Sequence, residues 1–208
     1  DGSQRPFLLT GDLADECPTV TECVFYENGP GATYGWSPDG QRLAFVFGSS
    51  PQGQGHRYAL YVADADGTDV REVTGCEPPD IAAACTDLAW SPDGTEIAVE
   101  TSGVGLVVVD ADTGTSRTIA DIRGSDPAWS PDGTQIAYRE VSATGDTIRI
   151  ASADGTSDSE LVYELPKGQG PGAPSWSPDG TRILFASQAS SSQEPEAIWV
   201  VDSPNADL

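Results

Sequence analysis

Short apolar runs alternate with turn-forming residues along the chain, and four of these runs follow one identical turn. The sequence Trp-Ser-Pro-Asp-Gly occurs at 36–40, 90–94, 129–133 and 176–180, and each copy leads after two polar residues into a strand-length apolar run. Proline presets φ for a tight turn, and glycine supplies the positive φ with which the chain re-enters a sheet. The pattern predicts short β-strands joined by tight turns and repeated about every 40 to 55 residues.

Each repeat predicts a sheet of four strands, the first of which ends at the tryptophan. The predicted sheets span residues 34–74, 88–120, 127–164 and 173–202. The last sheet lacks a fourth strand of its own, whereas Arg5–Thr10 has the pattern of a fourth strand with no sheet before it. Pairing of Arg5–Thr10 with Ile198–Asp202 would complete the last sheet and close a ring, which removes exposed strand edges.

These residues resemble the TolB-type, WD-like β-propeller repeat. In that repeat a Trp-Ser-Pro-Asp-Gly turn is followed by an Asp-x-Asp-Gly turn, as at 64–67, and by a strand ending in threonine. The resemblance covers Arg5 to Asp202 and implies one all-β domain over residues 1–208. The expected fold is a β-propeller with four blades of four antiparallel strands, closed by the N-terminal strand in the last blade. Four blades of a longer propeller are the alternative, and the complementary strands at the two ends favour the closed ring.

Charge narrows the range of partners. The chain has 33 acidic and 10 basic residues, a formal net charge of −23, so neither nucleic acid nor an anionic membrane surface is expected to bind. No apolar run approaches the about 20 residues that span a bilayer. The sequence contains no methionine, so residue 1 is not expected to be the translated start; a removed signal peptide or an excised segment would each explain this.

The cysteines fall into two local pairs, Cys17 with Cys23 and Cys76 with Cys85. Four cysteines allow three connectivities, and the sequence-local one is favoured, with free thiols as the alternative. Disulfides indicate an oxidising compartment, so the predicted location is secreted or cell envelope, either periplasmic or extracellular. His56 is the only histidine, and no zinc site is predicted.

The acidic turns at 64–67, 110–114 and 153–155 are too short for a calcium-binding loop, and Asp-Gly sequences favour hairpin turns. No metal and no cofactor are therefore expected, with weak calcium binding as the alternative. The chain has no Gly-x-Ser-x-Gly motif and no carboxylate pair with a distinctive spacing, so it is not expected to be an enzyme. The same repeat forms the propeller of serine peptidases of the prolyl oligopeptidase group, so a fragment of a larger hydrolase ranks as a lower alternative.

In a propeller the identical turns share one face, where their tryptophans are expected to pack between blades and their aspartates to cap the turns. The opposite face carries the connections between second and third strands and those between blades, which vary. Variable loops on a uniform scaffold are where recognition usually occurs. The candidate binding residues on this variable-loop face are His56, Arg57, Glu100, Arg123, Arg139 and Gln188.

The sequence thus predicts a non-catalytic, secreted or cell-envelope propeller that binds a protein partner through the variable-loop face. The resemblance implies the same class of role, because TolB is a periplasmic propeller that engages an envelope lipoprotein. The separate amino-terminal domain of TolB has no counterpart in this sequence. The alternative is a structural subunit of an extracellular assembly or filament, in which neighbours exchange Arg5–Thr10.

Overall fold

A computed structural model describes residues 33–49, 57–75, 85–101, 105–119, 124–140, 146–156, 160–165, 169–189 and 197–204. In these ranges the chain forms four antiparallel sheets of four strands each. The described residues contain no helix long and apolar enough to cross a membrane. The all-β prediction is confirmed.

The strands have the following bounds. The first sheet contains β1 (Tyr34–Trp36), β2 (Arg42–Ser49), β3 (Arg57–Asp64) and β4 (Arg71–Gly75), and the second contains β5 (Cys85–Trp90), β6 (Glu96–Thr101), β7 (Gly105–Asp110) and β8 (Ser116–Thr118). The third contains β9 (Gly124–Trp129), β10 (Gln135–Glu140), β11 (Thr147–Ser152) and β12 (Glu160–Glu164), and the fourth contains β13 (Gln169–Pro171), β14 (Ser175–Trp176), β15 (Arg182–Ala189) and β16 (Ala197–Asp202).

Strand order follows the chain in the first three sheets, and the fourth departs from it. There, β13 and β14 both pair with β15 along the same edge, while β16 pairs along the other. The sequence predicted the last sheet only from residue 173 and missed β13. Pro171 and Pro174 explain the split, because proline has no N–H to donate and interrupts the strand ladder.

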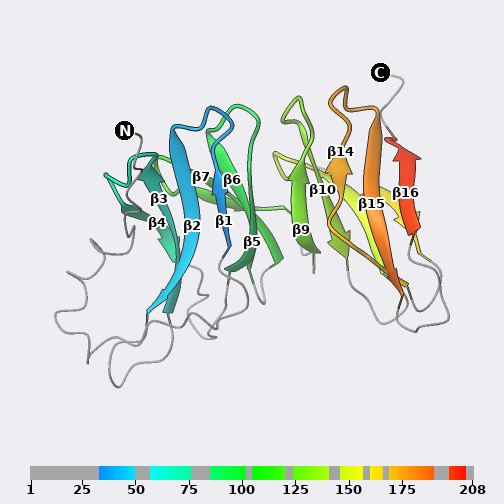
Figure 1. The fold of residues 1–208 in the computed structure, drawn as a ribbon, viewed down its shortest axis with the longest axis horizontal. Helices are drawn as coiled ribbons and strands as arrows, with labels where there is room; N and C mark the ends of the chain where they lie inside the picture. Colours follow the sequence, from blue (N-terminus) through cyan, green and yellow to red (C-terminus); the bar gives the residue numbers. More distant parts are fainter. Residues whose placement is uncertain are drawn as a thin grey trace, which may run out of the picture.

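The four sheets follow one another along the molecule, with the first sheet at one end and the fourth at the other (Figure 1). This arrangement agrees with consecutive blades of a propeller. The strand predicted to close the ring, Arg5–Thr10, lies outside the described residues, so closure stays a prediction.

The repeated turns have the geometry that the sequence predicts. The four glycines have φ values of 69° to 73°, at Gly40, Gly94, Gly133 and Gly180. The aspartate before each glycine accepts two or more hydrogen bonds; Asp132, for example, accepts from the Ser130 hydroxyl at 2.6 Å and from the Thr134 N–H at 3.0 Å. Hydrogen bonds within the turn therefore favour this turn conformation.

The core lies between the sheets rather than within one central mass. The first and second sheets enclose a buried cluster that includes Leu60, Trp90 and Val99. Leu106, Trp129 and Tyr138 belong to a second cluster, between the second and third sheets. A third cluster, with Ile148, Ile183 and Phe185, lies between the third and fourth sheets. A fourth cluster, which includes Phe45 and Tyr61, consists of residues of the first sheet alone. Burial of apolar side chains in the first three clusters holds neighbouring sheets together.

Three of the repeated tryptophans join neighbouring sheets. The indole N–H of Trp90 donates to the carbonyl of Gly35 at 2.9 Å, that of Trp129 to Ala89 at 3.0 Å, and that of Trp176 to Ala128 at 3.0 Å. These contacts confirm the predicted packing between blades for three copies. The prediction is wrong for Trp36, which is 57% exposed because no described sheet precedes the first.

Candidate functional site

The variable-loop face lies at the ends of the strands farthest from the repeated turns. The opposite end is uniform: the Ala65 N–H donates to the Gln41 carbonyl at 2.8 Å, so the two kinds of turn lie side by side there, as predicted. Most of the variable connections lie outside the described residues. The strand ends that carry them are described, and they hold the candidate site.

The structure places the six predicted binding residues unevenly. Glu100 lies near the end of β6 and Arg139 near the end of β10, in adjacent sheets. Arg57 begins β3 and Gln188 lies near the end of β15. His56 and Arg123 lie outside the described residues. The structure therefore brings Glu100 and Arg139 to one region of the molecule.

Two aspartates that the sequence analysis missed lie beside Glu100. Asp87 on β5 lies close enough to Glu100 for their carboxyl groups to share a hydrogen bond, and the charge of Asp126 on β9 acts on both. Burial, followed by the neighbouring carboxylates, raises the pKa of Glu100 above its usual range. Burial, followed by the charge of Asp126, raises the pKa of Asp87 in the same way. A proton is therefore bound more tightly here than by an isolated carboxyl group.

Arg139 extends this group of charges toward the fourth sheet. Its guanidinium lies 3.2 Å from the Asp146 carboxylate and 3.9 Å from that of Asp126. A Cβ atom added at Gly170 would lie 3.1 Å from the Asp146 carboxylate, so the backbone of β13 approaches closely. Asp126 itself has a φ of 55°, which is uncommon for a residue with a side chain and costs about 1 to 3 kcal/mol.

We call these five residues, Asp87, Glu100, Asp126, Arg139 and Asp146, the acidic cluster. It carries four carboxyl groups and one guanidinium, so it suits a ligand that offers a basic group. The side chains of Arg139, Asp126 and Asp146 are 31%, 27% and 19% exposed, so these three remain accessible from solvent. Within the described ranges no three His, Cys, Asp or Glu side chains are arranged to hold a metal ion.

A sequence signal for the missed aspartates exists. Asp87 and Asp126 are each the third residue before a repeated tryptophan, Trp90 and Trp129. The equivalent positions in the first and last repeats hold Thr33 and Ala173, which is why the position does not stand out in the repeat as a whole.

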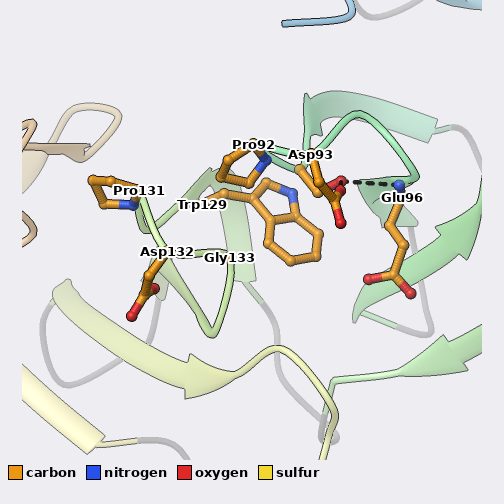
Figure 2. A pocket seen from close by; sticks show the side chains of 8 residues that line it. Pro92, Asp93, Glu96, Trp129, Pro131, Asp132 and Gly133 are labelled. Atoms are coloured by element: carbon orange, nitrogen blue, oxygen red, sulfur yellow. Dashed lines mark hydrogen bonds between the residues drawn. The ribbon is translucent and has the colours of Figure 1, made fainter.

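The uniform face has a hollow of its own between the second and third turns. Its volume is about 330 Å³. In Figure 2 the indole of Trp129 lies between Pro131 on one side and Glu96 on the other, with Pro92 above it. The repeated sequence of these turns indicates a scaffold role for this face and does not predict the hollow.

The preceding pair of sheets shows what such a hollow can hold. There the guanidinium of Arg42 lies 5.1 Å from the centre of the Trp90 ring and 2.8 Å from the Asp112 carboxylate. Glu96 takes the place of this arginine in the next sheet, so the space above Trp129 stays open. The Glu96 carboxylate is paired with Arg117, so a small cationic group in the hollow would meet the aromatic floor and the carboxylates of Asp93 and Asp132.

Cys85, at the start of β5, is 2% exposed and forms a disulfide. Cys17, Cys23 and Cys76 lie outside the described residues. The predicted pairing of Cys76 with Cys85 and of Cys17 with Cys23 therefore stays a prediction.

Comparison with known proteins identifies similar folds. The sequence profile of the TolB beta propeller domain matches residues 40–205. The putative TolB from Agrobacterium tumefaciens is 19% identical, with a TM-score of 0.55, over 82% of this chain and 76% of that chain. TolB from Acinetobacter baumannii is 18% identical, with a TM-score of 0.53, over 85% of this chain and 43% of that chain.

An enzyme is also among the similar structures. A structure from a study of two prolyl endopeptidases is 15% identical, with a TM-score of 0.57, over 79% of this chain and 27% of that chain. At such identities the likeness shows the fold alone. A comparison with curated proteins finds no significant match.

Proposed function

This chain belongs to the TolB beta propeller domain family, and on that premise we propose that it is a non-catalytic, cell-envelope propeller that binds a protein partner. The proposed binding surface is the variable-loop face of the second and third sheets. The family supports a role in the cell envelope, and the predicted disulfides agree with an oxidising compartment.

The observation that carries this proposal is the acidic cluster. Four of its five residues lie on strands of two adjacent sheets, and Asp146 directly precedes β11, so the charges are positioned before a ligand arrives. A partner segment with lysine or arginine side chains complements these charges. A formal net charge of −23 also favours basic partners and opposes nucleic acid.

A binding role fits the chain better than catalysis. The acidic cluster contains no serine, cysteine or histidine side chain, and the sequence has no Gly-x-Ser-x-Gly motif. The prolyl endopeptidase structure is matched over only 27% of its length, so its activity does not transfer to this chain.

Charge reversal in the acidic cluster tests the proposal. The double variant Glu100→Lys/Asp126→Lys is expected to bind a basic partner protein from the cell envelope at least about tenfold more weakly, because like charges then face each other. Glu160→Lys, at an exposed position on β12, is the control and is expected to bind as the wild type does. Titration of the purified pair by calorimetry measures the affinities.

Salt and pH provide independent readouts of the same binding. Affinity is expected to fall as ionic strength rises, because salt screens charge pairs. It is also expected to fall as the pH is lowered through the raised pKa values of Asp87 and Glu100, because protonation removes the charges that attract the partner. The proposal would be contradicted if the double variant and the Glu160→Lys control lost affinity equally. It would also be contradicted if affinity changed with neither salt nor pH.

A further inference from the structure

The three interfaces between neighbouring sheets share one spacing of their turns on the uniform face. A Cβ atom added at the glycine of each later turn would lie 3.6 to 3.7 Å from the proline of the turn before it, at Gly94, Gly133 and Gly180. The indole N–H of each later tryptophan donates to the preceding sheet at 2.9 to 3.0 Å. Differences between the interfaces on this face therefore come from their side chains.

In the first interface, an arginine fills the space beside the tryptophan. Arg42 is the second residue after the turn glycine, and its guanidinium lies 5.1 Å from the centre of the Trp90 ring. The same group donates to the Gly94 carbonyl and pairs with the Asp112 carboxylate at 2.8 Å. The chain itself thus shows that this position accepts a guanidinium, through a ring contact and two acceptors.

The second interface has the same three partners for a guanidinium. They are the Trp129 ring, the Gly133 carbonyl and the Asp154 carboxylate. Asp154 corresponds to Asp112, because each directly follows an alanine whose N–H donates to the residue after the turn glycine. Trp129 and Gly133 line the hollow of about 330 Å³ shown in Figure 2. The residue at the position of Arg42 is Glu96, so this interface has the partners but not the arginine.

The charge of Glu96 is already balanced within the protein. Arg117 donates to the Glu96 carboxylate at 2.8 Å, whereas its counterpart in the first sheet, Arg71, pairs with Asp112 at 3.1 Å. The two arginines are equivalent, because each donates at 2.9 Å to the carbonyl of the alanine before Asp112 or Asp154. Glu96 therefore engages Arg117 and leaves Asp154 to a different cation.

Asp93 and Asp132 bring two further carboxyl groups to the hollow. The backbone N–H of Thr95 donates to Asp93 and lowers its pKa, and the Ser130 hydroxyl does the same for Asp132. Both carboxyl groups are therefore ionised at neutral pH. Since the carboxylate–arginine pair beside them is neutral overall, the hollow combines an aromatic floor with negative charge, which favours a cation.

We propose that the hollow beside Trp129 binds an arginine side chain of a partner protein, whose guanidinium takes the position that Arg42 has in the first interface. This guanidinium lies over the indole, donates to the Gly133 carbonyl and pairs with Asp154. A planar guanidinium suits these partners better than an ammonium group does, because it stacks on the ring while its N–H groups reach acceptors at the edge.

The arginine belongs to a peptide chain rather than to the free amino acid. Free arginine carries a carboxylate of its own, which Asp93 and Asp132 repel, and a peptide chain lacks this charge at the bound residue. The hollow lies on the uniform face, so this site is independent of the acidic cluster. Its failure would leave the binding role proposed above unchanged.

Titration with a capped arginine, N-acetyl-arginine methylamide, tests the site. The indole N–H signal of Trp129 in the ¹⁵N-labelled protein reports binding, and its loss in Trp129→Phe identifies it. The expected dissociation constant is about 1 to 10 mM, and the capped citrulline, a neutral molecule of the same shape, is expected to bind at least about tenfold more weakly. Free arginine is expected to bind no more tightly than the capped form.

A substitution that supplies the arginine from within the chain should close the site. Glu96→Arg is expected to weaken binding of the capped arginine at least about tenfold, because its own guanidinium then lies over Trp129. Arg117 can then pair with Asp154 as Arg71 pairs with Asp112, so thermal unfolding is expected to show a folded protein. Glu160→Arg, at an exposed position on β12, makes the same charge change and is expected to bind as the wild type does.

The reverse substitution should open a second site. Arg42→Glu is expected to create an equivalent hollow beside Trp90, so that the Trp90 indole signal also shifts with capped arginine. This variant tests the site independently of whether Glu96→Arg folds. The proposal would be overturned by an unchanged Trp129 signal up to about 50 mM capped arginine, by equal binding of capped citrulline, or by tighter binding of free arginine. Equal binding by Glu96→Arg and Glu160→Arg, or an unchanged Trp90 signal in Arg42→Glu, would also overturn it.

Discussion

A single aspartate holds each repeated turn, and it does so as a carboxylate. Asp179 accepts hydrogen bonds from the Ser177 hydroxyl at 2.6 Å and from the N–H and hydroxyl of Thr181 at 3.0 and 2.8 Å. These bonds favour the charged form, the Ser177 hydroxyl most of all, and lower the pKa of Asp179 from 3.8 to about 2. The same arrangement at Asp154 lowers its pKa to about 2.

This lowered pKa predicts how acid affects stability. The stabilisation from Asp179 is present above its unfolded pKa of 3.8 and is lost as the pH falls through its folded pKa of about 2. Asp179→Asn is therefore expected to be less stable than the wild type at pH 7, and the difference should shrink as the pH falls through this window. Thermal unfolding at each pH measures it, with Glu160→Gln as the control for net charge. A difference that does not depend on pH would contradict the prediction.

Asp87 and Glu100 act in the opposite sense. Their pKa values are raised in the folded state, so folding favours their protonated forms. The stabilisation that this provides is fully present below their ordinary pKa values and is lost as the pH rises through the raised values. The candidate site is thus less favourable to folding at neutral pH than the turns are. Sites built for binding often have this property, because the ligand supplies the missing interactions.

At the scale of elements, the turns pack against neighbouring sheets, and the glycines show where space is short. Gly114, in the turn after β7, has a φ of 71°, and a Cβ atom there would overlap the Val73 carbonyl of the first sheet. Gly40, in the first repeated turn, has a φ of 69°, but a Cβ atom there would meet nothing within 4 Å. The two glycines therefore have the same left-handed backbone conformation, but only Gly114 lies in close contact with a neighbouring sheet.

Substitution at these glycines separates strain from contact. Gly40→Ala is expected to cost about 1 to 2 kcal/mol of unfolding free energy, from the left-handed backbone alone. Gly114→Ala is expected to cost about 2 kcal/mol more, because the turn and β4 must also move apart. Urea unfolding of both variants measures the difference, provided that the m-values agree with that of the wild type. Equal costs would show that the turn and β4 are not in close contact.

At the scale of the whole molecule, burial depends on whether another sheet follows. Leu106 and Ile198 occupy the same position in the second and fourth sheets, yet they are 0% and 76% exposed. The local sequence around them gives no reason for this contrast. The difference in exposure arises because the third sheet packs against the second, whereas no described sheet packs against this face of the fourth.

Truncation of these two residues measures the effect of position. Leu106→Ala is expected to cost about 2 to 5 kcal/mol, because it leaves a cavity between two sheets. Ile198→Ala is expected to cost less than about 1 kcal/mol in dilute protein, because the side chain is already in water. Chemical unfolding in dilute protein compares the two costs. Similar losses of unfolding free energy for the two variants in dilute protein would contradict the exposure of Ile198.

The fold and part of the candidate site could be predicted because their signals are local. The turn from Trp129 to Gly133 specifies its own conformation through proline, aspartate and glycine within five residues. Glu100 and Arg139 were predicted because they lie next to variable connections. Asp87 and Asp126 were missed because their meeting depends on how two sheets lie side by side, and β13 was missed because Pro171 and Pro174 obscure its strand pattern.

The sequence by itself determined most of the strands and the repeated turns, since these depend on contacts between residues close together in the chain. It also determined the family and the acidic character, which follow from the residue types themselves. Only the tertiary structure decided that Asp87, Glu100, Asp126, Arg139 and Asp146 form one cluster. It also decided that Trp36 and Ile198 are exposed while their counterparts are buried. The turn sequence around Trp36 is identical to that around its counterparts and cannot carry this difference, because burial depends on which sheet lies alongside in space.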